Sequence, residues 1–131
     1  MRSLVSVLLL ALVGTGCSDA LSPEEITGRW AQDLSAVESS WEIDLTTSGA
    51  NIVGTGSWYG EACCAGTLAV TGTISGRQVH LDITSTGQFP NGIQTSVSHF
   101  DGTLISSRVL EGTATYDTLG QLPQTVVYHR L

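Results

Sequence analysis

Short runs in which apolar and polar residues alternate are the feature of this chain that most constrains its fold. The clearest runs are WEIDLT at 41–46, TLAVTGTI at 67–74, QVHLDIT at 78–84 and VLEGTATY at 109–116. A period of two places alternate side chains on opposite faces of a β-strand, and no stretch after Gly28 shows a convincing helical period. The pattern predicts an all-β domain, with these residues on the apolar strand faces: Trp41, Ile43, Leu45, Leu68, Val70, Ile74, Val79, Leu81, Ile83, Leu110, Gly112, Ala114 and Tyr116.

Turn residues separate the runs, at 47–51, 74–78, 89–92 and 118–123. They predict about eight strands joined mostly by short hairpins, an order typical of an antiparallel up-and-down β-barrel. A Gly-Thr pair recurs within or beside strands, starting at 54, 66, 72, 102 and 112. Because glycine weakens a strand, its repeated use favours close backbone approach or the curvature of a small closed barrel. Hairpin-rich β structure in general is the alternative explanation.

The first 17 residues, MRSLVSVLLLALVGTGC, have the three parts of a secretory signal: Arg2, an apolar run at 4–13 and a series of small residues. The run is shorter than the roughly 20 apolar residues that span a bilayer. The ending GTGC resembles the lipobox of bacterial lipoproteins, although Gly14 stands where that motif usually has leucine. The resemblance implies that Cys17 is acylated as the mature N-terminus. Ordinary signal-peptide cleavage after VGTG is the alternative.

The residue after the cysteine is Ser18, and not the aspartate that commonly retains lipoproteins at the inner membrane. The resemblance therefore implies a lipid anchor in the outer membrane of a bacterial cell envelope. We expect a signal peptide at 1–16, a lipidated tether at 17–25 and a β-barrel domain at 26–131. Within the tether, SPEE at 22–25 can form one helical turn.

Charge argues against nucleic acid as a partner. The formal net charge is −7 and charged residues make up only 13% of the chain, so the surface lacks the basic patch that phosphate binding requires.

The two ends of the expected barrel together carry a family signature. The segments are GRW at 28–30 and VVYHRL at 126–131. They resemble the calycins (lipocalins and avidins), which open with Gly-x-Trp on the first strand and carry an arginine on the last. The resemblance implies a calycin-like barrel in which Gly28, Trp30 and Arg130 close one end. A guanidinium can stack on an indole face and still donate to nearby carbonyl groups.

The biotin site of the avidins does not carry over. Gln32 and Ala36 stand where avidins place asparagine and serine, and Val126 replaces an asparagine or aspartate that contacts biotin. On the intervening strands, Gly56 and Trp58 occupy the places of a tyrosine and a hydroxyl residue. Each lost hydrogen bond removes about 1 kcal/mol of binding, so biotin is not the expected ligand.

The expected function is to bind a small apolar or amphipathic molecule in the mouth of the barrel. Its candidate lining residues are Gln32, Trp41, Trp58, Tyr59, Val126 and Tyr128. The alternative is a structural or interaction lipoprotein with a filled barrel and a surface that contacts protein or glycan. A dry cavity above Trp30 larger than one side chain would favour the first hypothesis. A barrel filled by Leu68, Val70, Leu81, Ile83 and Leu104 would contradict it.

Cys63 and Cys64 are adjacent, and their Cα atoms lie about 3.8 Å apart across a trans peptide, which is shorter than the usual disulfide range. Three alternatives remain open: a vicinal disulfide, an intermolecular disulfide or two free thiols.

Chemistry at a catalytic or metal site is not expected. The chain has no GxSxG motif and no glycine-rich phosphate loop, so we predict neither an enzyme nor a cofactor. His80, His99 and His129 fall on three different strands, and His80 and His129 should point outward. A zinc site would require the histidines to converge with a carboxylate, and none is expected. The oligomeric state is not determined by these residues.

Overall fold

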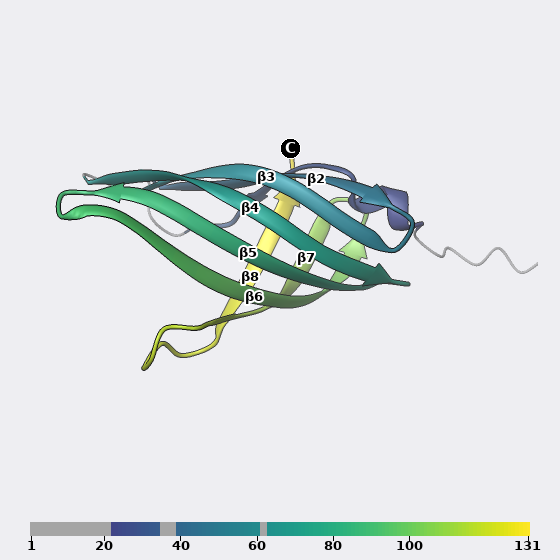
Figure 1. Ribbon diagram of the computed structural model, residues 1–131. Coiled ribbons are helices and arrows are strands. Elements are labelled where there is room, and N and C mark those ends of the chain that lie inside the picture. Colours follow the sequence, from purple (N-terminus) through teal and green to yellow (C-terminus); the bar gives the residue numbers. More distant parts are fainter. Residues whose placement is uncertain (1–21, 35–38, 61–62) are drawn as a thin grey trace, which may run out of the picture.

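Eight antiparallel strands pair in chain order and close into a barrel in the computed structural model (Figure 1), which describes residues 22–34, 39–60 and 63–131. A 3₁₀ turn, η1 (Pro23–Ile26), precedes β1 (Gly28–Gln32), β2 (Ser40–Ser48), β3 (Asn51–Gly60), β4 (Cys64–Ser75), β5 (Gln78–Phe89), β6 (Gly92–Ser106), β7 (Val109–Tyr116) and β8 (Gln124–Arg130). β1 pairs with β8 and completes the closure. The predicted eight-stranded up-and-down barrel is confirmed, whereas the expected signal peptide and Cys17 lie outside the described residues.

The barrel interior is filled by the apolar residues of the alternating runs. Those at most 3% exposed include Trp30, Ile43, Leu45, Ile52, Leu68, Val70, Ile74, Val79, Leu81, Ile83, Phe100, Leu104 and Leu110. Every residue whose side chain was expected to face inward on 67–74 and 78–84 is among them. Along β5, buried and partly exposed residues alternate over the nine positions from Val79 to Gly87, which is the period-two pattern of a half-buried strand.

The two ends of the barrel differ. One end, here called the closed end, carries η1, the start of β1 and the end of β8 (Figure 1). Ile26, the last residue of η1 and the first of the expected barrel domain, is fully buried in the core. The other end, here called the mouth, carries the β3–β4 loop, the projecting β5–β6 hairpin and the β7–β8 connection (Figure 1). Among the described residues, no helix is long and apolar enough to cross a membrane.

Glycines within the strands allow neighbouring backbones and aromatic rings to approach closely. A Cβ atom at any of the glycines that start the five Gly-Thr pairs would collide with a carbonyl oxygen of the neighbouring strand. Gly102 and Gly112 face each other across β6 and β7, and the ring of Phe100 lies over Gly102. Close approach is therefore the reason for the repeated Gly-Thr pairs.

Candidate functional site

Arg130 and Trp30 seal the closed end. The Arg130 guanidinium carbon lies 4.7 Å from the centroid of the Trp30 ring. Arg130 also donates from Nη1 to the carbonyl oxygen of Thr27 (2.6 Å) and from Nε to that of Ser107 (2.7 Å). A Cβ atom at Gly28 would lie 2.8 Å from Arg130 Nη1, and the φ of Gly28 is +135°, so both space and backbone favour glycine there.

Trp30 is not available to contact a ligand. Its side chain is fully buried, and its indole Nε1 donates to the carbonyl oxygen of Ile26 at 2.8 Å. With one ring face covered by Arg130 and its only donor used, Trp30 serves as a plug. The cavity that remains in the barrel is lined by other residues.

That cavity lies on the mouth side of the core and has a volume of about 230 Å³. Four of the predicted lining residues, Gln32, Trp41, Val126 and Tyr128, contribute to its wall. The rest of the wall consists of Leu34, Ile83, Ser98, Phe100, Ala114, Tyr116 and Gln124. The alternation of VLEGTATY already placed Ala114 and Tyr116 on the inward face, and this signal could have identified them as lining residues.

A second, shallower cavity of about 220 Å³ adjoins the first and shares Trp41 and Tyr116 with it. Trp58 and Phe89 line this outer cavity, with their ring centroids 5.6 Å apart. Tyr59 lines neither cavity and is 47% exposed, contrary to its expected place in the lining. It follows Trp58 directly, and consecutive strand residues point to opposite faces.

The polar groups of the two cavities are uncharged hydrogen-bonding groups. Burial raises the pKa of the Tyr128 hydroxyl far above its ordinary value, and burial also raises the pKa of Tyr116. Both hydroxyls are therefore protonated at neutral pH. Tyr116 donates to Gln124 Oε1 at 3.2 Å.

Two indole donors are buried beside the cavities without a hydrogen-bond partner among the described residues, Nε1 of Trp41 and Nε1 of Trp58. Burial raises the pKa of Tyr128 and the nearby Trp41 indole lowers it, although the two side chains do not meet hydrogen-bond geometry. Trp58 packs its indole over Gly66 and Gly87, a facing pair on β4 and β5. A buried donor without a partner costs about 1–3 kcal/mol, which a bound acceptor would recover.

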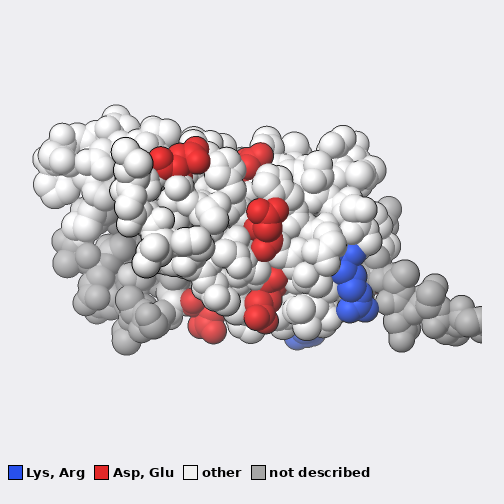
Figure 2. Space-filling view, turned by 90° about the horizontal axis from the view of Figure 1, so that it is seen from below, with Lys and Arg blue, Asp and Glu red and all other residues white. Residues whose placement is uncertain are grey.

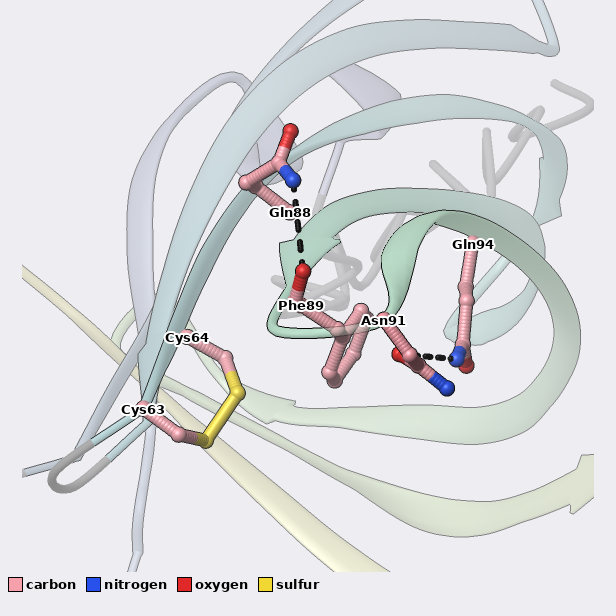
Figure 3. The surroundings of a disulfide bond; sticks show 6 residues. All are labelled: Cys63, Cys64, Gln88, Phe89, Asn91 and Gln94. Atoms are coloured by element: carbon pink, nitrogen blue, oxygen red, sulfur yellow. Dashed lines mark hydrogen bonds between the residues drawn. A yellow bond between two sulfur atoms is a disulfide. The ribbon is translucent and has the colours of Figure 1, made fainter.

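A vicinal disulfide stands at the rim of the mouth. Cys63 and Cys64 are joined, with Cα atoms 3.7 Å apart, so the structure contains the first of the three alternatives. Figure 3 shows this disulfide beside the β5–β6 hairpin, whose Gln88 donates to the Phe89 carbonyl and whose Gln94 donates to Asn91.

Five polar side chains on the outer face form a group that we call the outer-face cluster: His80, Asp82, His99, Asp101 and Asp117. Asp82 faces His99 and His80 faces Asp101 across β5 and β6. The two-residue turn Pro90–Asn91 sets this register, because it pairs Phe89 with Gly92. Counting residue by residue away from this turn, FPNG at 89–92, would have predicted both contacts. His80 and Asp82 do lie on the outer face as expected, but the convergence of His80 and His99 on one carboxylate was missed.

Hydrogen bonds link the whole cluster. His80 Nδ1 lies 2.7 Å from Asp101 Oδ1, and His99 Nε2 lies 3.0 Å from Asp117 Oδ1. The other ring nitrogens, Nε2 of His80 and Nδ1 of His99, lie 3.2 and 2.6 Å from Asp82 Oδ1. The bond to Asp101 raises the pKa of His80, the bond to Asp82 raises that of His99, and the bond to His99 lowers that of Asp82. His129 is not part of the outer-face cluster, and its Nε2 lies 3.8 Å from Asp33 Oδ2.

Acidic side chains outnumber basic ones in this protein, whose net charge is −7. Acidic side chains form a row across the barrel face shown in Figure 2, where basic side chains are fewer. The exposed Arg29 is paired with Glu42 at 2.8 Å. With a net charge of −7, such a surface attracts cations and repels phosphate.

Comparisons of the chain with protein-family models, with curated proteins and with solved structures found no match. The resemblance to calycins therefore stays a prediction, based on Gly28, Trp30 and Arg130.

Proposed function

We propose that this chain is an envelope-anchored binding protein whose barrel takes up one small apolar or amphipathic molecule through its mouth. The supporting observation is the pair of adjoining cavities of about 230 and 220 Å³, lined mainly by inward-facing aromatic and aliphatic side chains. An apolar cavity of about 150 Å³ is large enough to bind benzene. The space at the mouth therefore suits a ligand of one or two rings.

The chemistry of the lining narrows the ligand further. Its tyrosine hydroxyls are neutral, and the buried indole N–H groups of Trp41 and Trp58 have no acceptor among the described residues. A neutral molecule with an apolar ring and an acceptor oxygen would satisfy an indole N–H while burying its ring against Phe100 and Val126. A charged ligand would lose its hydration without gaining a counter-ion from the lining.

The alternative of a filled barrel with an interaction surface also has an observation in its favour. Leu68, Val70, Leu81, Ile83 and Leu104 are all buried and fill the barrel interior. This filling is what the interaction hypothesis predicts, and the two cavities that support binding lie on the mouth side of these residues. On this alternative the two cavities would hold water, and the outer strand faces would contact a partner protein or glycan.

Native mass spectrometry distinguishes the two functions. The full chain would be purified gently from envelope extract and compared with the same protein after denaturation and refolding, which removes any bound molecule. The binding function predicts a reproducible added mass on the native protein that is absent after refolding. A native protein of apo mass would support the interaction function instead.

We further propose that the barrel is tethered to the outer membrane through an acylated Cys17, on the strength of the GTGC ending of the apolar leader. The variant Cys17→Ala should then release the protein from the membrane fraction into the soluble periplasm. Detection of the wild type in the soluble fraction would contradict the anchor without affecting the binding proposal.

A further inference from the structure

We propose that the outer face of the barrel carries a binding site for one divalent transition-metal ion, with zinc the best-fitting ion, formed by His80, Asp82 and His99. Sequence analysis had predicted no metal site, because the three histidines lie on different strands. The hairpin register brings two of them to the same carboxylate.

The candidate ligand atoms converge. His80 Nε2, His99 Nδ1 and a carboxylate oxygen of Asp82 all lie within 4.8 Å of one another. A tetrahedral zinc ion with bonds of about 2.0–2.1 Å holds its ligand atoms roughly 3.3 Å apart. The paired strands β5 and β6 fix the Cβ positions of the two histidines. Small rotations of their imidazole rings would bring the three ligand atoms to that spacing.

The protonation chemistry of the cluster also favours a cation. Each imidazole has a carboxylate oxygen at both ring nitrogens, but a neutral imidazole has only one N–H to donate. When both histidines are neutral, the second nitrogen of each ring presents a lone pair toward Asp82 or an outer carboxylate. A divalent ion between His80, Asp82 and His99 would replace the missing protons and bind both lone pairs.

The outer carboxylates complete the arrangement. Asp101 lies 2.7 Å from Nδ1 of His80 and Asp117 lies 3.0 Å from Nε2 of His99. In the tautomers that donate to these outer carboxylates, the opposite nitrogen of each ring presents its lone pair toward Asp82. Metal-bound histidines usually donate their other N–H to a carboxylate in this way, which orients the ring and increases its basicity. An ordinary surface salt bridge does not require this arrangement on both histidines.

The surroundings would leave a metal partly accessible. The side chains of His80, Asp82 and His99 are 41%, 46% and 36% exposed. The flanking strands place threonines opposite the ligands, Thr71 and Thr73 on β4 and Thr115 on β7, so they add no competing positive charge at these register positions. Three protein ligands and a position open to water make a site in which bound metal can exchange.

The test is a zinc titration of the full chain, purified without a polyhistidine tag and held at pH 7.5 against a chromophoric chelator. The expected result is saturable binding of one Zn²⁺ per chain. The variants His99→Gln and Asp82→Asn should each weaken binding by at least about 10-fold, and Asp117→Asn by about 10- to 100-fold. Co²⁺ should give the visible absorption of a low-coordinate site, and Asp82→Asn should remove it.

His129→Gln is the matched control, because this histidine has a carboxylate neighbour, Asp33, but no second histidine. Circular dichroism would verify that each variant is folded. Unsaturable binding by the wild type, equal loss in the His129→Gln control, or unchanged affinity in the folded double variant His80→Gln/His99→Gln would each overturn the proposal.

Discussion

Arg130 covers the indole of Trp30 at 4.7 Å and at the same time bridges the carbonyl oxygens of Thr27 and Ser107. One side chain thus ties β8 to the chain before β1 and to the β6–β7 turn. Arg130→Met keeps an apolar stem but removes the cation and its donors. We expect it to lower the free energy of unfolding by about 2–4 kcal/mol, from the stacking and the charged hydrogen bonds together.

Urea unfolding measures this loss, and Arg29→Met is the control. Arg29 forms an exposed ion pair with Glu42, and removal of such a pair changes stability by about 0–1 kcal/mol. Equal effects of the two substitutions would mean that Arg130 does not secure the closed end.

Gly112 provides a second stability test. A Cβ atom there would collide with the carbonyl oxygen of Asp101 and with Cα of Gly102. Gly112→Ala should therefore cost at least about 1–3 kcal/mol, the usual effect of overpacking. In Gly60→Ala the new Cβ would lie 3.7 Å from its nearest neighbour, a ring carbon of Trp58, which is an ordinary contact distance. Thermal unfolding of this control should differ little from that of the wild type. A tolerated Gly112→Ala would contradict the close approach of β6 and β7.

The outer-face cluster makes stability depend on pH, and the sign follows from the pKa shifts. The pKa values of His80 and His99 are raised above 6.5, so their contribution is complete below pH 6.5 and is lost as the pH rises through the raised values. The pKa of Asp82 is lowered below 3.8, so its contribution is present above pH 3.8 and is lost as the pH falls through the lowered value. The cluster therefore stabilises the fold most between these two values.

Urea unfolding of the wild type and of Asp82→Asn, across acidic to alkaline pH and with a chelator present, measures this contribution. The difference in stability between the two proteins should be largest between pH 3.8 and 6.5 and should shrink on either side. A difference that stays constant with pH would show that the cluster does not titrate in this way.

The fold could be predicted from the sequence because strand alternation and hairpin turns are local signals. Where the alternation was followed, as at Leu81 or Ala114, the inward face was correct. Tyr59 was placed wrongly because its aromatic character was given more weight than its position one residue after Trp58. The His80–Asp82–His99 convergence was missed because it depends on pairing between strands, although the FPNG turn sets that register.

The cavity could be predicted only in part. Gln32, Trp41 and Tyr128 are among the residues expected to line the mouth, and closure of the barrel brings their strands, β1, β2 and β8, together. The volume left at the mouth depends on how the large side chains pack over the glycines, as Trp58 does over Gly66 and Gly87. Sequence alternation specifies the face on which a side chain lies, but not the space that it leaves.

The central claim, that the mouth accepts a neutral ring with an acceptor oxygen, is tested most directly at the indole N–H groups. Cyclohexanone would be titrated into ¹⁵N-labelled protein and the three tryptophan Nε1–H resonances followed by NMR. The Nε1 groups of Trp41 and Trp58, which have no hydrogen-bond partner in the described part of the chain, should shift saturably. That of Trp30, which donates to the Ile26 carbonyl, should stay in place. Ala114→Phe, which fills the inner cavity, should reduce the Trp41 response, and Thr125→Phe on the exposed face of β8 should not. Absence of saturable shifts, or equal shifts of all three indoles, would contradict the proposed binding function.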